Sequence, residues 1–235
     1  MSGPECCENP PALAVGEQNG EVKQIASLNS YVSGDPNSKI AVVLISDIWG
    51  YEAPKLRNIA DKVASAGYYT VVPDFFHGDP MTPGTQISDW LKNHAPEQGV
   101  GLAKPVVQAL KEKGASKVGA AGFCWGAKVV VELAKDADIE VAALLHPSFV
   151  SLDDIKGVKV PIAILGAEID KMSPPEVVKE FEAALKAKPE VDHFVKIYPG
   201  VSHGWTCRYK DEDEAEVKTA VEAHHDLVEW FGKRF

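Results

Sequence analysis

The chain has 235 residues, a formal net charge of −10 and 45% hydrophobic residues. This length suits a single α/β domain with a substantial core. The negative charge disfavours nucleic acids and anionic membranes as partners. No apolar stretch approaches the roughly 20 residues of a membrane-spanning helix. Small molecules therefore remain as the expected partners.

The first twenty residues are rich in proline, glycine and polar side chains, and we expect residues 1–20 to form an arm ahead of one domain, 21–235. They contain neither the basic nor the apolar region of a secretory signal. Four cysteines in the chain do not make a disulfide framework. These features predict a cytoplasmic protein. Cys6 and Cys7 have no further metal ligands close in sequence, so neither a metal nor a cofactor is expected.

Strand-like and helix-like segments alternate along the rest of the chain. Apolar runs predict strands at 39–46, 68–72, 118–121, 141–145, 161–165 and 194–198, and helical periodicity predicts helices at 54–66, 101–113, 127–135, 175–186 and 213–231. Short, almost wholly apolar runs are typical of strands that are buried on both faces. The alternation indicates right-handed crossovers and a doubly wound, mostly parallel sheet flanked by helices.

The segment Gly122-Phe123-Cys124-Trp125-Gly126 lies between the strand 118–121 and the helix 127–135. This is the context of a nucleophile elbow, G-x-S-x-G, with cysteine in place of serine. Glycines let strand and helix pass closely at a strained turn, and the helix N-terminus stabilises a thiolate. The alternative interpretation is a buried structural cysteine in a glycine-rich turn.

Two further residues follow in the order nucleophile, acid, histidine that α/β-hydrolases share. Asp170 comes after the strand 161–165, and His203 comes after the strand 194–198. Because the carboxyl ends of parallel strands meet at one edge, the sequence predicts that Cys124, His203 and Asp170 converge there. Glu168 is the alternative acid, two residues before Asp170.

The same edge should carry the oxyanion hole and the substrate contacts. The backbone N–H groups of Trp125, after the nucleophile, and Ile48, after the first strong strand, are the expected oxyanion donors. Aromatic and histidine side chains in loops after strands suggest an apolar pocket. The candidate substrate contacts are Trp49, Tyr51, Phe75, Phe76, His77, His146 and Trp205.

The sequence resembles the dienelactone hydrolase family of α/β-hydrolases, in particular its eukaryotic carboxymethylenebutenolidase-like members. The resemblance runs from about residue 20 to the C-terminus. It rests on Gly122-Phe123-Cys124-Trp125-Gly126, Gly166-Ala167-Glu168-Ile169-Asp170, Ser46-Asp47-Ile48-Trp49-Gly50, and Ser202-His203-Gly204-Trp205 with Arg208. It implies the α/β-hydrolase fold and cleavage of a small ester or lactone. The family's cysteine elbow is its most specific part, because most α/β-hydrolases use serine.

The resemblance also implies roles for Asp47 and Arg208. Asp47 stands where bacterial members have a glutamate that holds the resting cysteine, and aspartate is one methylene shorter. Bacterial members bind a substrate carboxylate through an arginine after the second strand, but residues 74–80 contain none. Arg208 is therefore the candidate contact for an acidic group of the substrate.

The resulting hypothesis is an esterase or lactonase, a monomer or weak homodimer, in which Cys124 forms a thioester with the substrate. Two alternatives stay open. One is a β-glucanase-like glycoside hydrolase, which needs two carboxylates about 5–10 Å apart. Candidate carboxylates are Asp47, Glu52, Asp74, Asp79, Glu168 and Asp170. The other is a protein that binds a small ligand in the same pocket without turnover.

Overall fold

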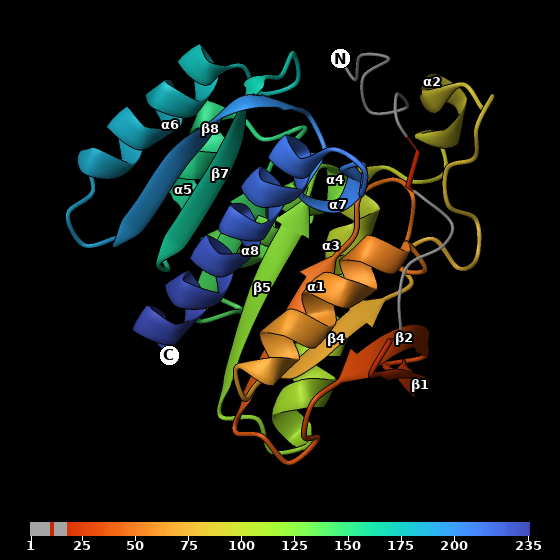
Figure 1. Ribbon diagram of the computed structural model, residues 1–235. Helices are drawn as coiled ribbons and strands as arrows, with labels where there is room; N and C mark the ends of the chain where they lie inside the picture. Colours follow the sequence, from red (N-terminus) through yellow and green to blue (C-terminus); the bar gives the residue numbers. More distant parts are fainter. Residues whose placement is uncertain (1–9, 12–17) are drawn as a thin grey trace.

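The computed structural model describes residues 10–11 and 18–235 (Figure 1). Most of the predicted N-terminal arm, including Cys6 and Cys7, lies outside the described residues. No helix in the described part of the chain is both long and apolar enough to cross a membrane.

One eight-stranded sheet forms the centre of the protein, with the order β1-β2-β4-β3-β5-β6-β7-β8. The strands are β1 (Glu21–Ile25), β2 (Leu28–Ser33), β3 (Ile40–Ile45), β4 (Tyr69–Pro73), β5 (Lys117–Phe123), β6 (Val141–Leu145), β7 (Ile162–Ile169) and β8 (His193–Ser202). All pairs from β4 to β8 are parallel, whereas β1 and β2 form an antiparallel hairpin at one edge. The predicted fold class is confirmed.

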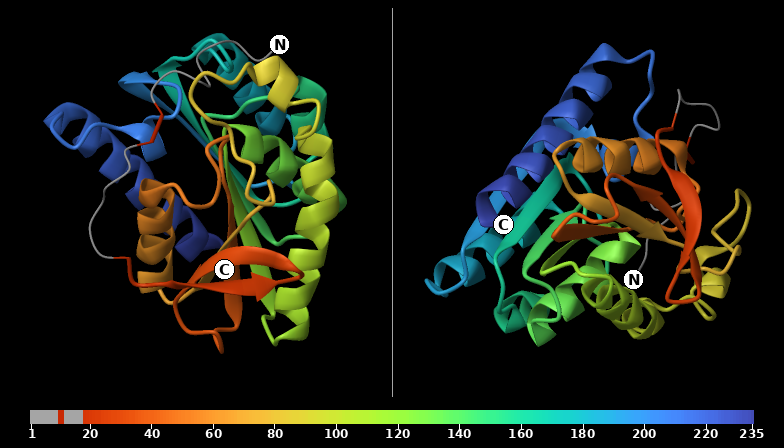
Figure 2. Two further views of the ribbon diagram at one scale, coloured as in Figure 1. Left: turned by 90° about the vertical axis from the view of Figure 1, so that its right-hand side faces the viewer. Right: turned by 90° about the horizontal axis from the view of Figure 1, so that it is seen from below.

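Helices cover both faces of the sheet. They are α1 (Pro54–Ser65), α2 (Ile87–Trp90), α3 (Pro96–Glu112), α4 (Trp125–Asp136), α5 (Leu152–Gly157), α6 (Pro175–Lys186), α7 (Trp205–Arg208) and α8 (Glu214–Arg234). The helices α1 and α8 pack on one face, and α3, α4, α5 and α6 pack on the other. Figure 2 (left) shows α1 and α3 on opposite sides of the sheet. Each face thus has its own apolar core.

The hairpin was not expected from the sequence. Its two-residue turn, Ala26 and Ser27, has positive φ at both positions, 48° and 69°. Such turns match the twist of a hairpin but normally contain glycine or asparagine, so this turn lacks its usual sequence signal. Because β2 runs antiparallel to β4, the turn lies at the carboxyl edge of the parallel strands.

A buried histidine joins α8 to α1 and α7. His224 Nε2 donates to the carbonyl oxygen of Thr206 at 2.7 Å, and its Nδ1 accepts from Lys62 Nζ at 3.0 Å. Burial, together with the charge of Lys62, lowers the pKa of His224 to about 3. The folded protein therefore holds this ring neutral at every mildly acidic pH.

We expect His224 to make the protein sensitive to acid. The unfolded chain takes up this proton near pH 6.5, the folded chain only near pH 3, so stability falls as the pH drops below 6.5. By pH 5 the loss from this residue is about 2 kcal/mol. His224→Gln keeps both hydrogen bonds without a titrating group. Urea unfolding at pH 7 and pH 5 should show a smaller difference for this variant than for the wild type.

The neighbouring His225 provides the control, because 75% of its side chain is exposed. His225→Gln should keep the pH dependence of the wild type. An undiminished pH effect in His224→Gln would show that other groups cause the acid sensitivity.

Candidate active site

Cys124 lies on a strained turn between β5 and α4. Its backbone has φ 51° and ψ −105°, and it is the N-cap residue of α4. The flanking glycines allow this turn. A Cβ at Gly126 would lie 2.2 Å from the carbonyl oxygen of Ile45, and one at Gly122 would lie 2.3 Å from that of Gly126. The strained backbone and close packing agree with the turn expected of a nucleophile elbow.

His203 and Asp170 form a buried pair. His203 Nδ1 lies 2.8 Å from Asp170 Oδ2, and the two side chains are 2% and 0% exposed. The other carboxylate oxygen of Asp170 accepts the backbone N–H groups of Met172 at 2.7 Å and Ser173 at 3.2 Å. Glu168 is exposed and accepts the N–H of Gly200 instead. The geometry therefore places Asp170, rather than Glu168, beside the histidine.

The sulfur of Cys124 and the ring of His203 interact electrostatically. Burial alone would lower the pKa of His203, but the charge of Cys124 and hydrogen bonds to Cys124 and Asp170 outweigh it. Together these effects raise the pKa of His203 to about 9. The ring is accordingly charged at neutral pH, which suits a thiolate–imidazolium pair.

The loop after β3 is held in shape by Asp47. Asp47 Oδ1 accepts the N–H of Trp49 at 3.0 Å, and its backbone oxygen accepts the N–H of Gly50 at 3.2 Å. The carbonyl oxygen of Ile48 accepts the N–H of Met81 at 2.8 Å. This rigid loop carries Ile48, the predicted oxyanion donor. Trp125, the other predicted donor, opens α4 directly after Cys124.

Arg208 connects that loop with the loop of the histidine. Its Nε lies 3.4 Å from Asp47 Oδ2, and both side chains are almost fully buried. The thiol of Cys207 also lies near Asp47 Oδ2, at 3.6 Å. A Cβ at Gly204 would lie only 2.1 Å from Arg208 Nη2, so glycine after His203 leaves room for the guanidinium. Asp47 therefore already supplies a negative partner to Arg208.

The predicted aromatic contacts are not all in one place. Phe75 and Trp125 line a cavity of about 250 Å³ together with His77. Tyr51 and His77 line a second cavity, described below. Phe76 packs in an aromatic cluster with Trp90, His94 and Trp125. Trp205 packs between Tyr198 and His146, and Trp49 is buried. The roles of these side chains as substrate contacts stay predictions.

His146 lies directly beside the histidine of the site. Its ring centroid is 5.1 Å from that of His203, in an edge-to-face arrangement, and its Nε2 lies 2.7 Å from Thr206 Oγ1. Burial, together with the charges of His203 and Arg208, holds the pKa of His146 well below its usual range. A neutral His146 therefore packs against the charged His203.

The sequence interpretation missed Ser148. Its hydroxyl oxygen lies 3.3 Å from the sulfur of Cys124, and its N–H donates to the carbonyl oxygen of Cys124. It follows β6 at the same sheet edge, which was the only available signal. Sequence reasoning had considered His146 in that loop but not the serine two positions later.

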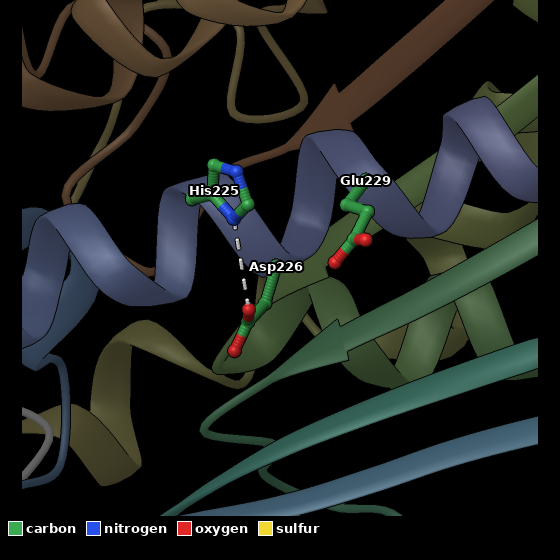
Figure 3. Close-up of side chains that lie close together, drawn as sticks. All are labelled: His225, Asp226 and Glu229. Carbon is green, nitrogen blue, oxygen red and sulfur yellow. Dashed lines mark ion pairs between the residues drawn. The ribbon is translucent and has the colours of Figure 1, made fainter.

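A cluster of side chains that could bind a metal ion lies away from this edge, on α8 (Figure 3). His225, Asp226 and Glu229 come close together there. Asp226 already bonds the hydroxyl of Tyr198 at 2.6 Å and pairs with Lys196. We assign no metal to this group, because its most buried carboxylate already has these partners.

The sequence matches a known family. The model of the dienelactone hydrolase family matches residues 28–235. The chain belongs to this family. Among its relatives is a human carboxymethylenebutenolidase homolog, 30% identical over 235 residues, with 97% of this chain and 96% of the human protein aligned. The dienelactone hydrolase family is a family of hydrolases, so the broad chemistry follows from membership.

Another relative of this chain is named after glucan cleavage. A maize endo-1,3;1,4-beta-D-glucanase is 45% identical over 193 residues, which are 80% of this chain. This chain spans only 63% of the maize protein. Among solved structures, a Klebsiella pneumoniae protein provisionally named a dienelactone hydrolase superposes with a TM-score of 0.75 at 19% identity. The superposition covers 91% of this chain and 98% of the Klebsiella chain. That likeness supports the fold.

The acid beside His203 can be tested without a substrate. Because Asp170 stabilises the charged ring, Asp170→Asn should lower the pKa of His203 well below its wild-type value of about 9. Glu168→Gln should leave it unchanged, because Glu168 is exposed and bonds Gly200. An NMR titration of the His203 ring measures both. A larger drop in Glu168→Gln would show that the acid assignment is wrong.

Proposed function

We propose that the chain hydrolyses small esters or lactones through a Cys124-His203-Asp170 triad and a thioester acyl-enzyme. The observation that carries this proposal is the Cys124 sulfur on a strained elbow at a helix N-terminus, next to a charged histidine that Asp170 holds at 2.8 Å. Membership of a hydrolase family supports the reaction class. A cysteine nucleophile works best in a reducing compartment, so we expect the protein in the cytosol.

The proposed reaction has two steps. In the first, the thiolate of Cys124 attacks the ester carbonyl carbon, and the C–O bond to the alcohol breaks. The imidazolium of His203 gives its proton to the departing oxygen, which in a lactone stays attached to the acyl chain. In the second step, neutral His203 removes a proton from water, and the resulting hydroxide attacks the thioester. The Cys124–acyl bond breaks, and the thiolate–imidazolium pair is restored.

The surroundings of the triad serve this reaction in the proposal. Asp170 fixes the ring of His203 in the tautomer and orientation that point its other nitrogen at the sulfur. The N–H groups of Ile48 and Trp125 stabilise the oxyanion, and each such donor is typically worth about 10²–10³ in rate. The rigid loop that Asp47 organises keeps the first of these donors in place.

A glycoside hydrolase is the second candidate. The maize relative carries a glucanase name, and Glu52 and Asp74 line one cavity of this chain. Such an enzyme would use the two carboxylates and would not depend on Cys124. We rank this candidate lower, because it leaves the elbow and the His203–Asp170 pair without a role.

We expect Cys124→Ala to abolish ester hydrolysis. Removing a nucleophile that acts with its base as a unit typically costs about 10⁴-fold or more. The assay uses p-nitrophenyl acetate, with circular dichroism to confirm the fold. Mass spectrometry of the acid-quenched wild type should show an acetyl group on Cys124. Cys207→Ala is the matched control, since Cys207 is the other free cysteine in the described part of the chain. It should keep the acetyl adduct.

Wild-type ester turnover in Cys124→Ala would rule out the thioester mechanism. Hydrolysis of mixed-linkage glucan that survives this substitution, with no ester turnover in the wild type, would favour the carboxylate mechanism. An absence of both activities in the wild type would favour a binding protein.

A second experiment concerns Arg208. Because Arg208 pairs with Asp47 and packs on Gly204, Arg208→Ala should disturb the oxyanion loop and lower kcat/KM on neutral and acidic esters alike. A displacement of this kind costs up to about 10²-fold. Ethyl butyrate and monoethyl succinate form the matched substrate pair. Arg234→Ala is the control, because Arg234 pairs with Asp192 elsewhere. A loss confined to monoethyl succinate would instead show that Arg208 binds the substrate carboxylate.

A further inference from the structure

A polar groove lies at the carboxyl edge of the sheet, beside the β1–β2 hairpin. Its volume is about 390 Å³, within the range of pockets that hold small ligands. The polar side chains that line it are Gln24, Ser27, Asn29, Glu52, Asp74 and His77. Tyr51 adds an aromatic ring to the lining. We call this cavity the polar groove.

The polar groove shares its sheet edge with Cys124. The hairpin turn reaches the end of β4, where the N–H of Asp74 donates to the carbonyl oxygen of Asn29 at 2.7 Å. In the sheet order β4 lies two strands from β5, a separation of about 10 Å. His77 lines both the polar groove and the cavity that contains Trp125, the residue after the nucleophile. The two cavities therefore meet at His77, so a molecule in the groove lies beside the elbow. Cys124 lines neither cavity and is 0% exposed, so its sulfur is reached only when neighbouring side chains move aside.

The lining is suited to a ligand with many hydroxyl groups. Gln24 and Asn29 are amides that both donate and accept hydrogen bonds, and the hydroxyl of Ser27 does the same. Glu52 and Asp74 accept hydrogen bonds, and Tyr51 offers an apolar ring edge with a polar tip. Sugars combine hydroxyl groups with apolar C–H faces, so they match this mixture of donors, acceptors and aromatic surface.

Charged ligands fit the polar groove less well. Neither lysine nor arginine belongs to its lining. Burial and the negative charges of Glu52 and Asp74 raise the pKa of Tyr51. The same negative charges would repel an anion. A cation would compete with Arg57, which lies 3.8 Å from Glu52 and 5.2 Å from the Tyr51 ring centroid. The carboxylate and the aromatic ring thus already have a cationic partner.

We propose that the polar groove binds the sugar of an acylated sugar, whose ester carbonyl is attacked by Cys124. This inference rests on the esterase function proposed above and names its substrate class. The thiolate forms a bond to the acyl carbon, the bond from that carbon to the sugar oxygen breaks, and the imidazolium of His203 protonates this oxygen. The free sugar leaves, and water releases the acid from the thioester.

Three acetate esters with one acyl group test the proposal: 6-O-acetylglucose, n-hexyl acetate and acetylcholine. The wild type should have the highest kcat/KM on 6-O-acetylglucose. Asn29→Ala and Glu52→Gln should each lower the ratio of kcat/KM for 6-O-acetylglucose to that for n-hexyl acetate about 5- to 10-fold, the loss of roughly one hydrogen bond. Gln108→Ala removes an exposed amide that lines neither cavity, and this variant should keep the ratio.

A direct binding measurement tests sugar binding in the groove independently of the thioester mechanism. Methyl β-D-glucoside, titrated into ¹⁵N-labelled protein, should shift the amide signals of Asn29, Glu52 and His77 in the wild type, and less so in Asn29→Ala. Absence of these shifts, an unchanged ester ratio, or a preference for acetylcholine would overturn the groove proposal. Ester hydrolysis that survives in Cys124→Ala would overturn the thioester mechanism while the glucoside shifts still decide the groove.

Discussion

The first turn of α4 lies directly against the backbone of β3, and the rest of the site depends on this contact. At Gly126 even a methyl group would meet the carbonyl oxygen of Ile45 at 2.2 Å. The contact brings the elbow of Cys124 next to the loop that begins after Ile45. The backbone of Cys124 and the predicted oxyanion donors are therefore positioned by backbone packing, which does not depend on side-chain rotation. The proposed reaction needs such pre-organisation, because its chemistry takes place at one carbon atom.

Charges in this buried edge are arranged in matched pairs. His203 lies between the sulfur of Cys124 and the carboxylate of Asp170, while Arg208 lies against Asp47. His146 packs on the ring of His203 yet stays neutral. Unpaired charges would be costly at such burial, so each ionised group needs a partner of opposite sign. This pairing explains how a site with almost no exposed surface can hold several charges.

Much of the fold could be predicted from the sequence, because buried parallel strands are apolar and helices are periodic. β6 and α6 have the predicted bounds, and Asp170 and His203 follow their strands as expected. The β1–β2 hairpin escaped prediction, because Ala26 and Ser27 are unusual in its turn. The contact of Ser148 with Cys124 and the pairing of Arg208 with Asp47 depend on side-chain packing between distant segments, which one sequence does not encode as a local pattern.

The sulfur of Cys124 belongs to a residue with 0% exposed surface. Hydrogen peroxide and other oxidants therefore reach it only when neighbouring side chains move aside, although its paired histidine makes it intrinsically reactive. In the proposed reaction the same motion must admit each substrate. The rate of opening would then limit both turnover and oxidation of the sulfur, and the molecules that enter during the open interval would decide the ratio of the two.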